Sequence, residues 1–135
     1  MATEKKYTIT CTKEQLKMIS EAVEDWHRFL AGQCELSNAM KYLMREGNEW
    51  KIEDILSQQI KPLVTPELSL NASYNWNGGN CPNDNQRKAI AMSYGIYRQI
   101  EHFFALQRND NDWNVYRSPT LTCEEQGGLI GVKEV

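Results

Sequence analysis

Apolar residues recur at helical spacing in the first part of the chain. Five of them follow one another at intervals of three and four residues: Leu16, Ile19, Val23, Trp26 and Leu30. Such a stripe is typical of an amphipathic helix. Thr12 and Gln15 have the spacing of a capping box just before the stripe, and Gly32 follows it. The pattern predicts a helix that begins after Thr12 and ends at about Ala31.

Two further helices are predicted, from about Glu35 to Arg45 and from about Glu49 to Ile60. Pro62 and Pro66 follow, and because proline lacks an amide proton we expect them to end helical structure. Residues 65–84 show no period and are rich in amides, which predicts a long irregular segment.

The next segment carries two apolar stripes, which indicates a helix packed on both sides. They are Ala89, Ser93, Ile96, Ile100 and Phe103, and Ile90, Tyr94, Tyr97 and Phe104. Asn83 or Asp84 can cap this helix, which we expect from about 84 to 107 as the most buried element.

Both ends of the chain favour strands. Residues 7–11 alternate and are β-branched, and residues 114–117 and 129–133 also resemble short strands. The predicted fold class is therefore α+β: predominantly helical, with a central buried helix at about 84–107 and a small sheet from both chain ends. The length of 135 residues predicts a single domain over 1–135.

Composition excludes several classes of protein. The chain is 41% hydrophobic and 24% charged, with a net charge of −3, which argues against a protein that coats duplex nucleic acid. No apolar run is long enough for a membrane span, and no apolar segment follows the lysines near the start, so we expect a cytoplasmic protein. The four cysteines are widely spaced, which favours free thiols without a metal or cofactor.

The ionisable residues show no catalytic pattern. His27 and His102 have neither a nucleophile motif nor a metal-ligand spacing around them, so we expect surface or half-buried helix histidines. Glu24 and Arg28 have the spacing of an ion pair on one helix face. An enzyme acting on nucleotides is therefore the last-ranked function.

One candidate anion site precedes the long helix. Asn77, Gly78 and Gly79 lead into its N-terminus, where unpaired amides attract phosphate, and Arg87 follows near the first turn. The alternative is an ordinary turn before a capped helix, with Trp76 in the core.

A second candidate segment lies near the carboxyl end of the chain. Arg117 precedes the hydroxyls of Ser118, Thr120 and Thr122, which suit phosphate or ribose oxygens or else an ordinary turn. Four aromatic residues in polar surroundings could stack on a base or instead belong to a core or interface: Tyr74, Trp76, Trp113 and Tyr116.

Three segments resemble an uncharacterised family of small phage and prophage proteins from gut bacteria: Leu16–Leu36, Asn71–Phe104 and Val115–Ile130. The resemblance implies a phage-encoded accessory protein in the cytoplasm of an infected bacterium. It supplies no catalytic residue. Small phage proteins of this size recurrently sequester the nucleotide second messengers of bacterial immunity, which is an association by context.

The leading hypothesis is a non-enzymatic protein that binds a small phosphate-bearing ligand, as a sponge for a nucleotide second messenger. The alternative is a protein that interacts with, or inhibits, a host or phage protein. Thirteen aromatic residues are more than one small core easily encloses, so we also expect a homo-oligomer.

Overall fold

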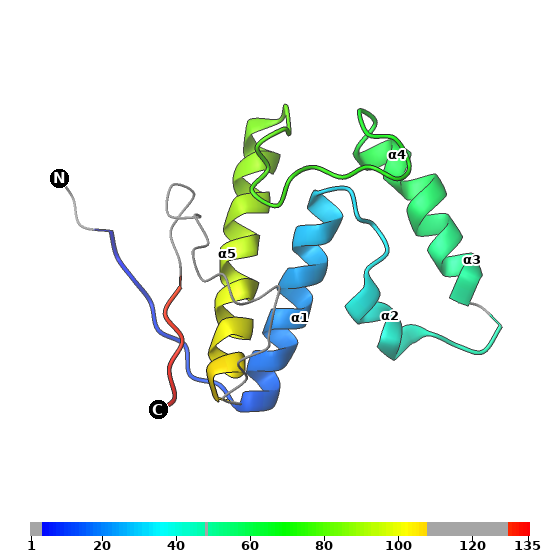
Figure 1. The fold of residues 1–135 in the computed structure, drawn as a ribbon. Coiled ribbons are helices and arrows are strands. Elements are labelled where there is room, and N and C mark those ends of the chain that lie inside the picture. Colours follow the sequence, from blue (N-terminus) through cyan, green and yellow to red (C-terminus); the bar gives the residue numbers. More distant parts are fainter. Residues whose placement is uncertain (1–3, 48, 108–129) are drawn as a thin grey trace.

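The computed structural model describes residues 4–47, 49–107 and 130–135. All regular secondary structure in these residues is helical (Figure 1). The elements in chain order are α1 (Lys13–Leu30), α2 (Ser37–Leu43), α3 (Glu49–Asp54), the π-helical turn η1 (Ile55–Ile60), α4 (Lys61–Val64) and α5 (Asp84–Gln107). No helix in this part of the chain is long and apolar enough to span a membrane.

The first predicted helix is confirmed, together with its capping box. The Thr12 side chain accepts a hydrogen bond from the Gln15 amide, and the Gln15 side chain accepts one from the Thr12 amide. After the helix, Gly32 has a φ of 98°, which a residue with a side chain rarely adopts. A Cβ atom there would lie 2.5 Å from the Leu68 side chain, so this turn also brings the 65–83 loop against the end of α1.

Helices α1 and α5 lie side by side and run in opposite directions (Figure 1). The bounds of α5 confirm the helix predicted from about 84 to 107. Ile90 and Ile100 of α5 are fully buried, as expected for a helix that is covered on more than one side. Tyr74 and Cys81 of the preceding loop pack with Ile90 and Ala31 in a small apolar core. The loop therefore closes over the junction of the two long helices.

The third predicted helix continues past its expected end at Ile60. Helix α3 passes through η1 into α4, and Pro62 lies in the first turn of α4. The prediction that Pro62 ends the helix was wrong because the π-helical turn precedes it. There the Lys61 amide bonds to the Leu56 carbonyl, one residue further back than in an α-helix. This wider turn leaves space for the Pro62 ring, and the helix tolerates the missing amide proton of Pro62.

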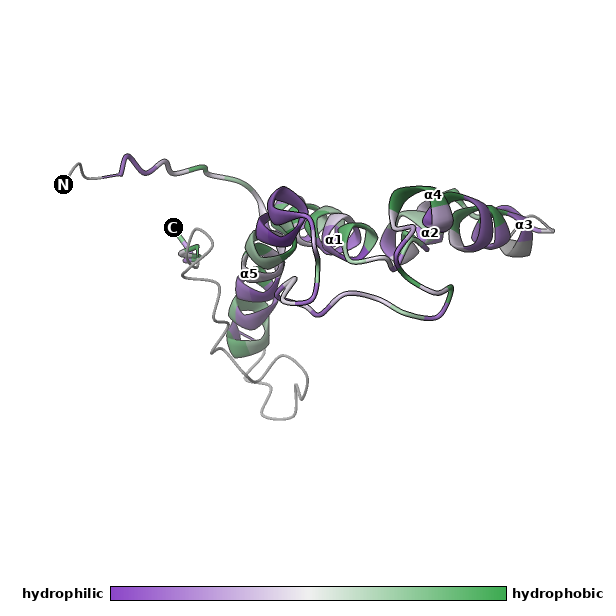
Figure 2. Ribbon diagram, turned by 90° about the horizontal axis from the view of Figure 1, so that it is seen from above, coloured by the Kyte–Doolittle hydropathy of each residue, from purple (hydrophilic) through white to green (hydrophobic). Residues whose placement is uncertain are grey.

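The segment α3–η1–α4 projects away from the α1–α5 pair, as Figure 2 shows from above. Its end is fastened by the buried Lys61, whose Nζ atom donates to the carbonyls of Leu70 (2.7 Å) and Ala72 (2.5 Å). Leu63 is 77% exposed on this segment. Helix α2, shorter than predicted, packs against α1 instead.

The predicted α+β fold class was wrong, since the described residues form helices and contain no strand. Residues 7–11 and 130–133 are non-helical but unpaired, and Tyr7 and Ile9 are 88% and 75% exposed. Alternating β-branched residues favour an extended backbone, but a strand also needs a neighbouring strand for its hydrogen bonds. The third predicted strand, at 114–117, lies outside the described residues.

Candidate functional site

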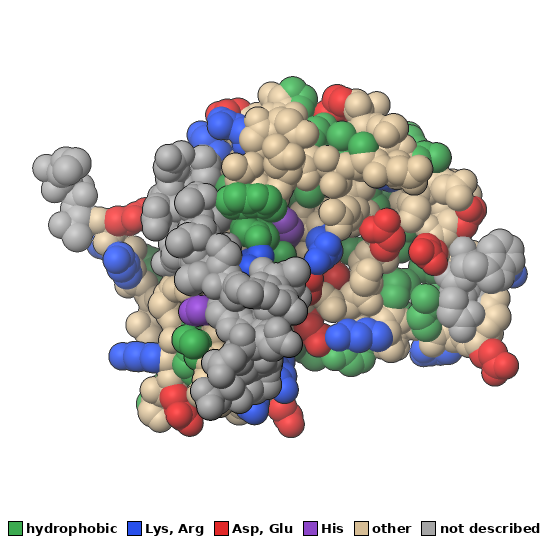
Figure 3. Space-filling view, viewed as in Figure 1, with side chains coloured by type: hydrophobic (Ala, Val, Ile, Leu, Met, Phe, Trp, Pro, Cys, Tyr) green, Lys and Arg blue, Asp and Glu red, His purple; other side chains and the backbone are tan. Residues whose placement is uncertain are grey.

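A pocket of about 260 Å³ lies between α1, α5 and the loop that precedes α5. We call it the α1–α5 pocket. Its lining combines aromatic rings, two arginines and one amide: His27, Arg28, Ala31, Gln33, Tyr74, Trp76, Tyr94, Tyr97 and Arg98. In the view of Figure 3, hydrophobic, histidine and cationic side chains lie next to one another on the same face. Tyr74 and Trp76, which the sequence predicts as ligand-binding residues, both line this pocket.

Aromatic rings on one side of the pocket contact one another directly. The ring centroids of Trp76 and Tyr94 are 4.8 Å apart, and Tyr94 meets Tyr97 edge-on at 5.6 Å. The His27 ring lies 5.1 Å from Tyr94 and 5.5 Å from Tyr97. Tyr97 is buried, whereas Trp76 is 41% exposed. Trp76 is therefore the ring that presents a large accessible surface to solvent.

His27 is buried beneath these rings, so the expectation of a surface or half-buried residue was wrong for it. Its Nδ1 atom lies 2.9 Å from the Ile90 carbonyl oxygen, which can only accept, so Nδ1 carries the proton. Burial lowers the pKa of His27 to about 4, although the bond to Ile90 acts in the opposite direction. At neutral pH the ring is uncharged. His102, by contrast, is half-buried as expected.

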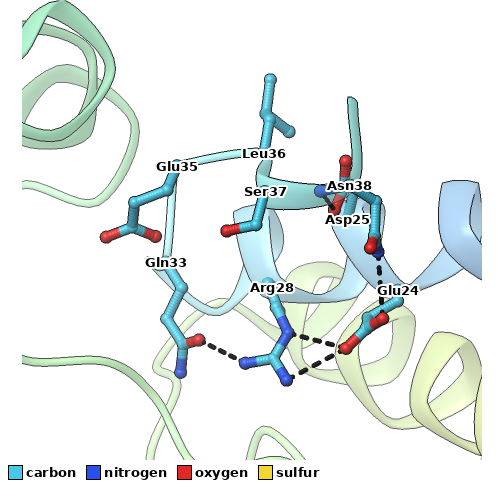
Figure 4. A pocket seen from close by; sticks show the side chains of 8 residues that line it. All are labelled: Glu24, Asp25, Arg28, Gln33, Glu35, Leu36, Ser37 and Asn38. Atoms are coloured by element: carbon cyan, nitrogen blue, oxygen red, sulfur yellow. Dashed lines mark hydrogen bonds and ion pairs between the residues drawn. The ribbon is translucent and has the colours of Figure 1, made fainter. Parts of the chain in front are cut away.

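The two arginines come from opposite helices. Arg28 of α1 donates to Glu24 through Nε (3.1 Å) and Nη2 (3.0 Å), which confirms the predicted pair, and to Gln33 through Nη1 (2.7 Å) (Figure 4). Arg98 of α5 is buried, donates to the Tyr94 hydroxyl and lies with its guanidinium carbon 5.0 Å from the Tyr94 ring centroid. Two fixed guanidinium groups thus border an aromatic surface.

Two tyrosines complete the lining as neutral phenols. Burial raises the pKa of Tyr97. Burial and a hydrogen bond from the Tyr74 hydroxyl to Glu67 raise the pKa of Tyr74 as well. Neither phenol ionises near neutral pH. The pocket therefore offers flat apolar faces and cationic donors, a combination that suits a planar anion.

At the predicted anion site before α5, both glycine amides are hydrogen-bonded within the loop. The Gly78 amide bonds to the Asn75 carbonyl, and the Gly79 amide bonds to the Asn77 side chain. A Cβ atom on Gly78 would lie 2.7 Å from the Arg87 carbonyl oxygen, so this glycine allows the loop to approach α5 closely. Arg87 forms an ion pair with Asp84, as Arg28 of the pocket does with Glu24, so ion pairing does not distinguish the two sites. Asn77, Gly78, Gly79 and Arg87 do not line the α1–α5 pocket.

The second predicted segment is not placed by the structure. Six predicted ligand-binding residues lie outside the described part of the chain: Trp113, Tyr116, Arg117, Ser118, Thr120 and Thr122. Conversely, sequence reasoning missed His27, Arg28 and Gln33 on one side of the pocket and Tyr97 and Arg98 on the other. The helical spacing of Tyr94 and Tyr97, with Arg98 next to them, was the available signal, but the two tyrosines were interpreted as part of a buried stripe.

A smaller hollow of about 210 Å³ lies on the other side of Arg28 and Gln33, between α1 and the start of α2 (Figure 4). It contains Asp25, whose carboxylate accepts hydrogen bonds from the Asn38 amide (3.1 Å) and the Ala39 amide (2.8 Å). Asp25 is thus occupied in holding α2. Within the described ranges, no group of three histidine, cysteine or acidic side chains could hold a metal ion.

Comparison with known proteins does not assign the chain to a family. No protein-family model, no curated protein and no solved structure matches it.

Proposed function

We propose that the chain binds a small, planar, negatively charged molecule of the nucleotide class in the α1–α5 pocket, without converting it. The observation that carries the proposal is the meeting of Trp76, Arg28 and Arg98 around one cavity. The resemblance to phage proteins extends the proposal to sequestration of a nucleotide signal in the cytoplasm of an infected bacterium.

Charge supports an anionic ligand. The net charge of −3 gives no general attraction for phosphate, so an anion must be bound by local donors. Arginine suits this role because its planar fork pairs with two phosphate oxygens and also stacks on rings. An aromatic cage for a cation would require the opposite electrostatics, and the two guanidinium groups disfavour it.

The protonation states support binding without turnover. A general base needs a pKa near the working pH, and His27 has a pKa of about 4. Its Nδ1 atom is also held by the Ile90 carbonyl. The nearby carboxylate of Glu24 is already bound to Arg28. These groups position a ligand more readily than they activate water.

Replacing Trp76 by alanine should weaken nucleotide binding by about 1–3 kcal/mol, the usual contribution of one aromatic–base stack. Isothermal titration with nucleoside monophosphates, cyclic nucleotides and ADP-ribose derivatives measures the effect. In the parent chain, a ligand at about a hundred times its Kd should stabilise the fold by about 2.7 kcal/mol in thermal unfolding.

The matched control is Trp26→Ala. Trp26 is 59% exposed on α1 and does not line the pocket, so this variant should bind like the parent. Arg28→Gln and Arg87→Ala then distinguish the pocket from the site that the sequence predicts before α5. Weakening by Arg87→Ala alone would place the ligand at the start of α5. Absence of binding to every nucleotide tested would contradict the proposed function.

Exposed apolar residues on α2 and the α3–η1–α4 segment favour the second candidate function, a protein–protein interaction. They are Tyr42, Leu43, Ile55, Leu63 and Val64, between 44% and 77% exposed. We expect light scattering at micromolar concentration to report a particle larger than the 15.6 kDa chain, and Leu63→Lys to reduce its size. A 15.6 kDa particle for the parent would contradict this expectation.

A further inference from the structure

Resting on the proposed function, we infer that the α1–α5 pocket takes a single nucleobase with its phosphate, a nucleoside monophosphate, and that a dinucleotide does not fit within one chain. The inference follows from the arrangement of the rings, the size of the cavity and the position of the arginines.

Among the described residues, the rings leave one stacking surface. Aromatic centroids 4.5–7 Å apart belong to rings in direct contact, so no base can enter between them. Trp76 and Tyr94 are 4.8 Å apart, and Tyr94, Tyr97 and His27 all lie within 5.6 Å of one another. Tyr97 and His27 are buried, and the half-buried Tyr94 contacts both Trp76 and the Arg98 guanidinium, so a base stacks on the accessible side of Trp76. One such surface holds one base.

The size of the cavity also favours a ligand with a single nucleotide unit. Pockets that enclose drug-sized ligands range from about 300 to 1,000 Å³. The α1–α5 pocket, at about 260 Å³, lies just below that range. It can hold most of one nucleotide, whereas a cyclic dinucleotide has two bases and two phosphates. Its second half would remain in solvent or require the pocket of another chain.

The arginines border the same cavity as Trp76, which allows one ligand to use both. Arg28 is oriented by Glu24 and Gln33, and its side chain remains 42% exposed. Arg98 reaches the pocket from the opposite helix. A phosphate on the sugar of the stacked base can therefore meet a guanidinium group without leaving the pocket. The base and the phosphate of one nucleotide should therefore both contribute to its affinity.

The experiment is isothermal titration of the full chain with AMP, GMP, CMP, UMP, adenosine, inorganic phosphate and two cyclic dinucleotides. We expect at least one monophosphate to bind as one molecule per chain, and adenosine and phosphate to bind at least about tenfold more weakly than the monophosphate. Trp76→Ala should weaken AMP and adenosine together and leave phosphate unchanged. Arg28→Gln should remove the advantage of AMP over adenosine. Trp76→Phe, which keeps a ring, should retain part of the affinity.

Each outcome bears on the inference. A cyclic dinucleotide that binds more weakly than the monophosphate, or as one molecule to two chains, supports it. One dinucleotide per chain, bound at least about tenfold more tightly than any monophosphate, overturns the inference and leaves the proposed function standing. If no nucleotide binds the parent chain, both fail.

Discussion

Acidification from about pH 6.5 to about pH 4 should remove about 3 kcal/mol of unfolding free energy through His27 alone. Burial lowers the pKa of this residue from 6.5 to about 4, so between these values the unfolded chain binds a proton that the folded chain excludes. Stability is therefore complete above the unfolded pKa and is lost as the pH falls toward the folded one. Urea unfolding at a series of pH values measures the effect.

Among the described residues, the charges around His27 do not offset the effect of its burial. On α1 its charged neighbours are Arg28, which lowers the pKa, and Glu24, which raises it only slightly. On α5 the ring meets the Ile90 carbonyl, the Ser93 hydroxyl at 3.3 Å and the Tyr94 and Tyr97 rings. A protonated imidazole there would be held mainly by the Ile90 carbonyl dipole, which is costly in a buried site.

The control is His27→Asn, which can still donate to Ile90 but does not titrate. Carboxyl groups such as Glu21 and Asp84 have pKa values lowered by their cationic partners, so they act at lower pH and equally in both chains. The difference between parent and variant should therefore grow from about pH 4 to about pH 6.5 and flatten above about pH 7. If the unfolding free energies of parent and variant instead changed with pH in parallel, the pKa of His27 would be the same in the folded and unfolded chains.

The two long helices were predictable because their signals are local. The Thr12–Gln15 capping box and the apolar stripe of α1 lie within one segment, and so does the double stripe of α5. Pro62 was misinterpreted because a π-helical turn depends on the backbone before it, which residue types do not reveal. The prediction of a small sheet was wrong for a related reason. Residues 7–11 have strand chemistry, but pairing is a non-local property.

The candidate site was only partly predictable. Tyr74 and Trp76 were identified because large aromatics in an amide-rich loop are unusual. Gly78 and Gly79 were assigned to an anion because free amides were expected there, but the loop uses those amides internally. The remaining lining comes from the facing sides of α1 and α5. A stripe that contains Tyr94 and Tyr97 predicts burial, whereas the cavity depends on how one helix is rotated against the other.

Replacing Asp25 by alanine should destabilise the fold by about 2–4 kcal/mol, since it removes two hydrogen bonds to a buried charged acceptor. Asp25 lies on α1, yet it caps α2 by accepting from the Asn38 and Ala39 amides. Helix α2 has only seven residues and begins after Leu36, which is left-handed (φ 52°) and makes no side-chain cap. A helix this short has little stability of its own, so it depends on the neighbouring carboxylate.

Urea unfolding and amide hydrogen exchange should separate this role from an ordinary surface contact. Amide exchange at Asn38 and Ala39 should accelerate in Asp25→Ala, and Asp25→Asn, which retains one acceptor oxygen, should lose less stability. Glu21→Ala is the matched control, because Glu21 also joins α1 to α2, through Lys41 (3.0 Å) and the Tyr42 hydroxyl (3.1 Å), but at the surface. Its loss should cost at most about 1 kcal/mol. If Asp25→Ala were as mild as Glu21→Ala, α2 would be held by its packing on α1 and not by the carboxylate.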